Sequence, residues 1–384
     1  MTQKAPVIIS SESPFASDVF AKRHPALIDR LVAAWPFGPE QRQALFALAE
    51  EGVHGVIHPL PDRAADAGLW RDWGSDLYGR PWAEVPFLWA ESFFYRRLLE
   101  ATGYFEPEPW RGIDPFAPFK QAELAGEVVS AEIAALDDVV GLAEAELGQA
   151  LLLSSLWGNR ADLGFQITAG RGNEASGLVA DDSARLWELL RSEAGGTVAV
   201  VADNAGSEMV ADLVLIDHLL THGLAREAVL HVKPSPYHVS DATLADVADC
   251  LRALLLSKGE ARAVGERLRE AAAIGRLHVR TDTFFCAPFD FTAMPGALRR
   301  QFASATVTIL KGDLNYRRLI GDRWWEPTIP FAGVTDHFPG RVAALRTLKS
   351  DVIVGLEPGA LTELNARAPH WRTSGTHAVV QVRS

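Results

Sequence analysis

The stretch that decides the fold is Thr197-Val-Ala-Val-Val-Ala202, an apolar run that leads directly into Asp203-Asn204-Ala-Gly-Ser-Glu208. A short run of small and β-branched apolar residues is typical of a strand that is buried on both faces of a parallel sheet. We expect the Gly turn and the helical pattern that follow to place Asp203 and Asn204 at the carboxyl end of this strand, beside a helix N-terminus. A carboxylate and an amide there suit a divalent cation, and the helix N-terminus suits an anion. The stretch therefore predicts a phosphate site.

Similar apolar runs of four to seven residues recur downstream and alternate with helical patterns. Residues 208–222 and 244–257 carry apolar side chains at three- and four-residue spacing, which predicts helices that pack on the sheet. Strands that alternate with helices are typical of a mostly parallel α/β sheet covered on both faces. The predicted strands are residues 197–202, 228–232, 276–280, 307–310 and 351–356, with residues 376–382 as a late edge strand.

The N-terminal part of the chain has a different character. It is rich in Trp, Pro and Phe, shows no strand alternation, and contains helical stretches at residues 41–51 and 89–102 separated by prolines. We expect residues 1–125 to form a helical region packed on a core of residues 126–384, because no low-complexity linker separates the two.

Composition narrows the class of protein. A chain of 384 residues with 48% hydrophobic residues is long enough for a large α/β domain and a smaller one. Its formal charge of −12 disfavours nucleic-acid and anionic-membrane surfaces. Its two cysteines, Cys250 and Cys286, form no CxxC pair, and no signal pattern or 18-residue apolar span is present. We expect a cytoplasmic protein that acts on a small molecule; the sequence leaves the oligomeric state open.

Polar residues collect where the predicted strands end. Ligands of open α/β sheets bind at the carboxyl ends of the strands, so these residues are the candidates for a site. Carboxylates and an amide would hold a hard divalent cation, while lysine and arginine would bind the remaining phosphate charge. The residues in question are Asp203, Asn204, Lys233, Asp241, Lys311, Asp313, Asn315, Arg317, Arg346 and Lys349.

Each of these residues also has a simpler interpretation. Asp203 is as well explained as a helix N-cap or an Asx-turn residue, and Asp241 as a helix cap after Ser240. Taken singly, Lys311 and Arg317 are better explained as solvated surface charges. Because all of them are predicted to lie at one edge of the sheet, their interpretation as residues of a ligand site is favoured over these simpler interpretations.

Several longer motifs in one order extend this picture. They are Ala90-Glu-Ser-Phe-Phe-Tyr-Arg-Arg97, Asp114-Pro-Phe116 with Lys120, Leu156-Trp-Gly-Asn-Arg160 with Asp162-Leu163, Asp203-Asn-Ala-Gly-Ser-Glu208 with Asp212-Leu213, His231-Val-Lys233 with Ser240-Asp241, Lys311-Gly-Asp-Leu-Asn-Tyr-Arg317, and Arg346-Thr-Leu-Lys349. Together they resemble the metal-dependent damage-control phosphatases, once called domain of unknown function 89. The Arg-Thr-x-Lys form is similar to the subgroup that contains the acidic-residue methyltransferase 1 proteins.

The resemblance implies a three-layer α/β/α sandwich with a mostly parallel sheet and an N-terminal helical bundle. It also implies one bound divalent metal (Mn, Mg, Co or Ni) and hydrolysis of small phosphomonoesters such as fructose phosphates or damaged phosphometabolites. The metal ligands it implies are Asp203, Asn204 and Asp241, which with Lys349 form the catalytic set. The residues it implies at the substrate are Asn159, Glu208, Asp313, Leu314, Asn315, Tyr316, Arg317, Arg346 and Lys349.

In the expected reaction the metal polarises a phosphoryl oxygen while Lys349 and Arg317 neutralise the other oxygens. The attacking oxygen belongs either to water or to a carboxylate, and spacing does not decide between them. Two rival functions are carboxyl methylation of protein glutamate by S-adenosylmethionine and metal-dependent sugar-phosphate binding without turnover. Methylation is disfavoured because the chain has no Gly-rich turn after the first predicted strand, where S-adenosylmethionine sites usually have one. Binding without turnover is disfavoured because a passive binder does not need a full set of acidic and basic side chains.

Overall fold

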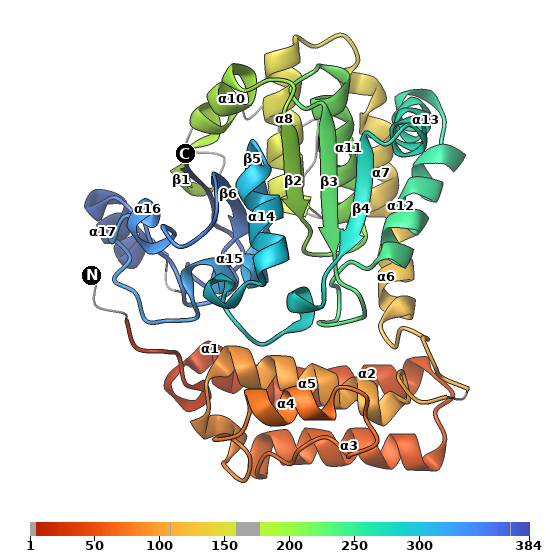
Figure 1. Cartoon of the computed structure of the whole chain (residues 1–384), viewed down its shortest axis with the longest axis vertical. Helices are drawn as coiled ribbons and strands as arrows, with labels where there is room; N and C mark the ends of the chain where they lie inside the picture. Colours follow the sequence, from red (N-terminus) through yellow and green to blue (C-terminus); the bar gives the residue numbers. More distant parts are fainter. Residues whose placement is uncertain (1–4, 108, 159–176, 369) are drawn as a thin grey trace.

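A computed structural model of the chain describes residues 5–107, 109–158, 177–368 and 370–384. Its centre is a seven-stranded sheet in the order β1-β7-β6-β5-β2-β3-β4 (Figure 1). The strands are β1 (Leu178–Asp181), β2 (Thr197–Val201), β3 (Glu227–Val232), β4 (Leu277–Thr281), β5 (Val307–Lys311), β6 (Val342–Thr347) and β7 (Ala378–Arg383).

The stretch that opens with Thr197 forms β2, in the interior of the sheet. It pairs in parallel with β5 on one side and β3 on the other, and parallel pairing continues to β6 and β4 at the two flanks. Val198 and Val200 belong to the apolar core on one face, whereas Ala199 and Val201 belong to the core on the opposite face. The uninterrupted apolar run is explained by this burial on both faces.

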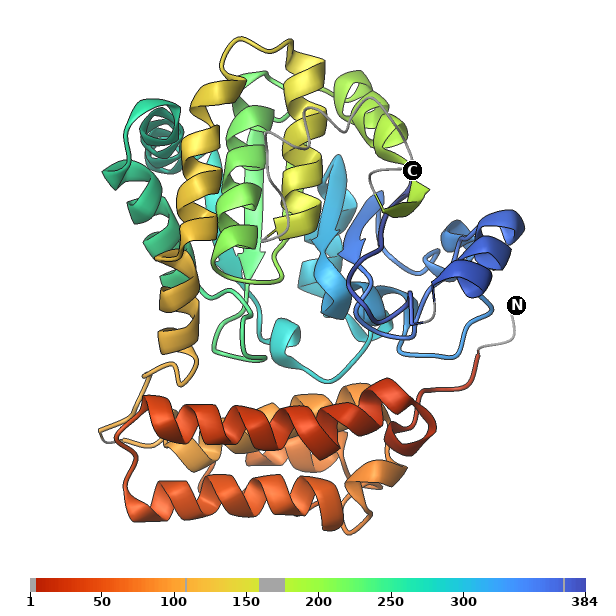
Figure 2. The same cartoon turned by 180° about the vertical axis from the view of Figure 1, so that it is seen from behind.

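Helices cover both faces, which confirms the three-layer α/β/α architecture (Figures 1 and 2). One layer contains α7 (Glu127–Ala135), α8 (Glu144–Trp157), α10 (Ser183–Ser192), α11 (Ser207–Thr221), α12 (Leu244–Leu256) and α13 (Gly259–Ala273). The opposite face packs against α14 (Gly296–Ser304), α15 (Gly312–Ile320) and α16 (Phe331–Val334), and Leu361 and Leu364 of α17 (Pro358–Arg367) pack against the same apolar core.

The N-terminal helices form a bundle across the edge at which β2, β3 and β4 end (Figure 1). They are α1 (Pro14–Asp18), α2 (His24–Ala34), α3 (Pro39–His54), α4 (Ala67–Trp73) and α5 (Phe87–Thr102), and α6 (Ala117–Leu124) leads from them to α7. Aromatic side chains such as Phe20, Trp82 and Phe94 fill the bundle. The division of the chain at residue 125 stays a prediction.

Two of the strand predictions are wrong. Residues 351–356 form no strand; the strand of this region is β6, which precedes them. Residues 352–354 are apolar and buried like a strand, but Gly355 and Leu356 donate to carbonyls of Ile329 and Pro327, outside the sheet. Burial rather than pairing therefore produced the apolar pattern.

The second error concerns the edge of the sheet. Residues 376–382 do contain a strand, β7, but it lies between β6 and β1 and runs antiparallel to β6. The edge strand is β1, which the sequence interpretation did not include. Within the described residues, no helix combines the length and the apolar character that a membrane crossing requires.

Candidate functional site

The loops that follow β2 and β3 are joined by backbone hydrogen bonds at the carboxyl edge of the sheet. Ala205 N donates to Ser240 O at 2.7 Å, and Ala242 N donates to Asp203 O at 2.9 Å. Between them Asn204 and Asp241 form an isolated antiparallel bridge. Two loops distant in sequence thus bring Asp203, Asn204 and Asp241 together, as expected for the ends of neighbouring parallel strands.

Neither aspartate has the capping role that offered the simpler interpretation. Helix α11 begins after Gly206 without a side-chain cap, and α12 begins after Thr243, which forms a capping box with Asp246. Asp203 and Asp241 are both buried. Lys233 Nζ lies 3.6 Å from Asp241 Oδ2 and is the one cation within ion-pair distance of that carboxylate among the described residues. A single lysine offsets only part of the charge of two buried carboxylates, and an uncompensated buried charge is costly.

Hydrogen bonds fix the orientation of the Asn204 side chain. Its Nδ2 donates to Glu208 Oε1 at 2.9 Å and to Asp203 Oδ2 at 3.3 Å, and its Oδ1 accepts from Ser240 Oγ at 2.6 Å. The amide oxygen keeps one further lone pair for a ligand. Asn204 therefore links Glu208 to the pair of aspartates.

Several like charges meet at this point. Burial raises the pKa of Asp203 well above its ordinary value, and the nearby carboxylates of Glu208 and Asp241 raise it further, against the opposing effect of Lys349 and Lys233. Asp241 Oδ2 is buried without a hydrogen bond from any described residue. A divalent cation fits this donor set, since two carboxylates and an amide are oxygen ligands of the kind that Mg²⁺ and Mn²⁺ take.

The set is small compared with dedicated metal sites. Within the described parts of the chain, no group of three or more His, Cys, Asp or Glu side chains could hold a metal. The predicted ligands Asp203, Asn204 and Asp241 include only two such residues. A hard ion that keeps several water molecules suits this arrangement better than a fully enclosed one.

Helix α15 approaches Asp203 closely because its first residue is glycine. Gly312 has φ +80, and a Cβ there would lie 1.7 Å from Asp203 Oδ2. No side chain fits, so glycine is required both by the backbone and by the space. The N-terminus of α15 therefore lies beside the buried carboxylate. The N-terminus of α11 is covered instead, since Ser207 N and Oγ both donate to Glu123 Oε1, at 3.3 and 2.9 Å.

The predicted substrate residues on α15 have internal partners. Arg346 and Ser350 donate to Asp313, and although burial alone would raise the pKa of this carboxyl, Arg346 and Arg317 hold it below its usual range. Asn315 Nδ2 donates to the carbonyls of Ala202 and Lys311. Tyr316 donates to Gln381, and Leu314 packs beside Leu88 and Tyr237. These contacts position α15 against the ends of β2 and β6.

Arg317 and Lys311 are buried, so their interpretation as solvated surface charges is wrong. Arg317 donates to Glu91 at 2.7 Å and to both oxygens of Asp322. Lys311 donates to Asp212 at 2.6 Å and to Ser155 O. A role of Arg317 at the phosphate stays a prediction.

Lys349 is more exposed than Arg317 and Lys311. Its side chain is 47% exposed, and its Nζ lies 3.8 Å from Glu208 Oε1. Its backbone N donates to Asp313, which holds the Arg-Thr-x-Lys segment against α15. Of the remaining predicted residues, Asn159 lies outside the described residues.

Three residues from the N-terminal region reach this edge, and local sequence patterns did not identify their roles. Glu91 pairs with Arg317, Glu123 covers α11, and Lys120 Nζ donates to Asp241 O at 2.8 Å. Their partners lie 84 to 226 residues away along the chain. Glu91 and Lys120 lie within the motifs quoted from the sequence, which is the one sequence feature that pointed to them, and Glu123 lies in none of these motifs.

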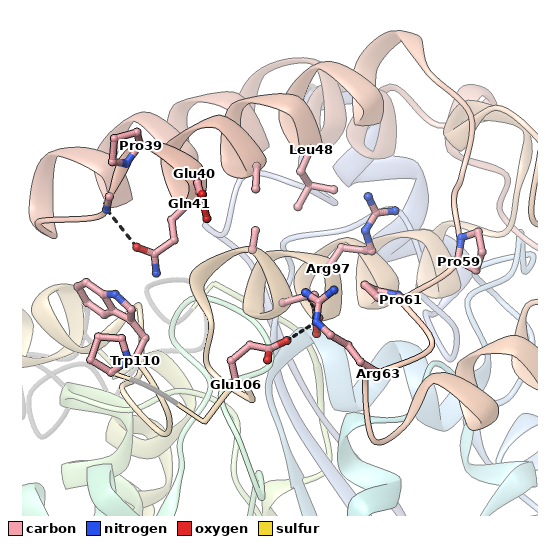
Figure 3. Close-up of a pocket in the computed structure, with 15 residues that line it drawn as sticks. Pro39, Glu40, Gln41, Leu48, Pro59, Pro61, Arg63, Arg97, Glu106 and Trp110 are labelled. Carbon is pink, nitrogen blue, oxygen red and sulfur yellow. Dashed lines mark hydrogen bonds and ion pairs between the residues drawn. The ribbon is translucent and has the colours of Figure 1, made fainter.

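A cavity of about 810 Å³ lies elsewhere, in the N-terminal bundle (Figure 3). Its arginines already have partners: Arg63 pairs with Glu106 at 2.8 Å, and Arg97 pairs with Glu51 at 3.1 Å. The close-up shows Arg63 and Glu106 joined at one side of the cavity and Trp110 at the other. The predicted phosphate site does not use this cavity.

Comparisons with known proteins identify the family of the chain. Residues 19–364 match the family described as damage-control phosphatase ARMT1-like domain. Proteins called damage-control phosphatase ARMT1 from Danio rerio and Mus musculus are 31% and 32% identical over 366 and 363 residues. These matches cover 85% of this chain and 81% and 82% of those proteins. The human protein of that name is 31% identical over 363 residues, with 84% and 82% covered.

A solved structure shares the fold. The crystal structure of a DUF89 family protein from Pyrococcus horikoshii superposes with a TM-score of 0.52 at 13% sequence identity, and the match covers 96% of this chain and 98% of that one. At this identity the likeness concerns the fold alone.

Proposed function

The chain belongs to the damage-control phosphatase family, and from this premise we propose a divalent-metal-dependent centre built by Asp203, Asn204 and Asp241. As a member, the chain is a phosphoric monoester hydrolase. Beyond this activity, we propose which metal the chain uses, which residues hold it and which class of substrate it hydrolyses. The observation that carries it is the joining of the β2 and β3 loops, which leaves Asp241 Oδ2 buried beside Asp203 without a hydrogen bond from any described residue.

The proposed ligands are one carboxylate oxygen each from Asp203 and Asp241 and the amide oxygen of Asn204. Mg²⁺, Mn²⁺, Co²⁺ or Ni²⁺ bound there would supply Lewis-acid polarisation of a phosphoryl oxygen. The protein fixes the ligands beforehand: Ser240 orients Asn204, and Lys120 holds the backbone of Asp241. Such fixed supports preserve ligand geometry.

Lys349 is proposed to bind the phosphate. Its half-exposed ammonium group lies 3.8 Å from Glu208 Oε1, and the same oxygen accepts from Asn204 Nδ2 at 2.9 Å, which supports a position beside the proposed metal ligands. Arg346 supports it by holding Asp313, which in turn accepts from Lys349 N. The N-terminus of α15 adds a partial positive charge beside Asp203.

The N-terminal bundle is proposed to limit the size of the substrate. It lies across the carboxyl edge of the sheet (Figures 1 and 2), and the ion pair between Glu91 and Arg317 joins it to α15. A covered edge admits small phosphorylated metabolites more readily than phosphoproteins. We therefore propose sugar phosphates, fructose phosphates among them, and related damaged metabolites as the substrate class.

The test is a phosphate-release screen over sugar phosphates and phosphorylated cofactor fragments with each of the four metals. We expect hydrolysis that EDTA abolishes and the metal restores, and we expect Asp203→Ala to lose it while keeping the circular dichroism spectrum. Metal-dependent turnover that survives in Asp203→Ala would contradict the assignment of the centre. Calorimetry with S-adenosylmethionine tests the methyl-transfer alternative. Saturable binding with a micromolar Kd would support methyl transfer, and absence of binding would exclude it.

A further inference from the structure

Two buried lysines hold Asp241 from opposite ends. Lys233 Nζ lies 3.6 Å from the carboxylate atom Oδ2, whereas Lys120 Nζ donates to the backbone oxygen of Asp241 at 2.8 Å. Lys120 is also paired with Asp114 and Asp246, so its charge is already compensated. Lys233 contributes its charge to the proposed metal ligand itself.

The environment of Lys233 is unusual for an ammonium group. Its side chain is 2% exposed, and its Nζ has no hydrogen-bond partner among the described residues. The rings of Tyr237 and Phe285 lie 5.7 and 6.0 Å from Nζ, which gives weak cation–π support. Among described carboxylates within ion-pair distance, only Asp241 faces it.

We propose that Lys233 is a built-in counter-ion of Asp241 that competes with the metal and limits the affinity of the site for it. This inference rests on the proposed metal centre. Without a metal, the ammonium group compensates the buried carboxylate and keeps the two loops joined. With a divalent cation bound, the same ammonium group is a like charge close to the ion and weakens its binding.

The charge of Lys233 also favours phosphate binding at the metal-loaded centre. Asp203, Glu208 and Asp241 supply three carboxylates, and Lys233 and Lys349 supply two cations. A bound divalent cation then leaves the ionised cluster with a net positive charge, which attracts a phosphate dianion. If Lys233 were absent, the charges of the loaded centre would balance and this attraction would be weaker.

A purely structural role for Lys233 predicts the opposite effect on metal binding. If the lysine only supported the loop, its removal would disorder Asp241 and weaken metal binding together with stability. If it is a competing counter-ion, its removal destabilises the metal-free protein but strengthens metal binding. The sign of the change in affinity separates the two roles.

The experiment uses the full chain, freed of metal with EDTA, and titrates Mn²⁺ by calorimetry and by electron paramagnetic resonance of free Mn²⁺. We expect Lys233→Met to bind Mn²⁺ roughly tenfold more tightly than wild type. We also expect its melting temperature to fall without metal and to recover more than that of wild type when Mn²⁺ is added. Lys233→Gln, which keeps a donor but not the charge, carries the same expectation and replaces the Met variant if that variant does not fold.

Lys311→Met is the matched control, because Lys311 is equally buried at a strand end and paired with one aspartate, Asp212. We expect it to lose stability with a much smaller gain in Mn²⁺ affinity. Unchanged or weaker Mn²⁺ binding by a folded Lys233 variant overturns the inference, while wild-type hydrolysis still supports the proposed function. Absence of Mn²⁺ binding and of hydrolysis in wild type overturns the proposed function, and the inference fails with it.

Discussion

Arg317 Nη1 donates to Glu91 Oε2 at 2.7 Å, and this buried ion pair joins α15, at the edge of the sheet, to α5 of the N-terminal bundle. The guanidinium group is also held by Asp322 and lies 4.6 Å from the centre of the Phe87 ring. The pair therefore connects the region that covers the site to the helix beside Asp203.

Glu91→Gln should destabilise the protein. The change leaves the buried guanidinium with only one of its two carboxylate partners, and breaking a buried pair is costly, so we expect a loss of about 2 kcal/mol or more in the free energy of unfolding by urea. Glu193→Gln removes an exposed ion pair with Arg341 and is the control, with an expected loss below about 1 kcal/mol. Equal losses in the two variants would show that the buried pair between Glu91 and Arg317 contributes no more to stability than an exposed ion pair.

Gly312→Ala should remove activity. The new Cβ would clash with the Asp203 carboxylate, and the positive φ adds backbone strain of about 1 kcal/mol or more. We expect the displaced carboxylate to lower kcat/KM at least about 100-fold, as seen when reacting groups move by an ångström. Gly333→Ala is the control, since nothing lies within 4 Å of the added atom. An active Gly312→Ala enzyme would mean that Asp203 tolerates displacement.

Lys349→Met should affect substrate binding more than stability. The side chain is half-exposed, so we expect little change in the unfolding free energy, but the loss of its charge should lower kcat/KM about tenfold or more. Lys22→Met changes a lysine on the surface of the bundle and serves as the control in the same steady-state assay. A kcat/KM equal to that of wild type would remove Lys349 from the phosphate site.

Stability should fall in acid because of buried histidines. Burial, reinforced by Arg280, lowers the pKa of His231 to about 4, below the ordinary value near 6.5. The unfolded chain then takes up a proton below pH 6.5 while the folded protein resists until about pH 4, so stability declines across this window as pH falls. Between pH 8 and pH 5, the difference in the pKa of His231 between the folded and unfolded protein should lower the free energy of unfolding by about 2 kcal/mol.

His231→Leu should make the unfolding free energy less dependent on pH between 6.5 and 4. The comparison is a set of urea unfolding curves at several pH values for both proteins. A His231→Leu protein with the slope of wild type would assign the acid sensitivity to other groups.

The sequence predicted those parts of the fold that depend on local patterns. Strands β2 to β5 begin and end within one residue of their predicted bounds, because both faces of the sheet demand apolar residues there. Residues 352–354 satisfy the same pattern without pairing, since burial in the core beside Tyr316 of α15 requires the same residue types. Pattern alone does not separate these two cases.

For the candidate site, the sequence indicated which residues meet but not how they are supported. Asp203, Asn204 and Asp241 follow neighbouring parallel strands, so topology brings them together. The contacts of Glu123 and Lys120 with α11 and the Asp241 loop depend on how distant helices pack. Such contacts leave no periodic signal in the sequence.

The position of β7 has a consequence for the order in which the sheet is assembled during synthesis. Of the described strands, β1 pairs only with β7, and Leu178 aligns with Ala378. The ribosome therefore releases β1 long before its partner exists, and the sheet is completed only when residues 378–383 insert between β1 and β6. Until then β6 presents an open edge of the kind that recruits strands from other chains, so the growing chain needs its last strand to protect itself from aggregation.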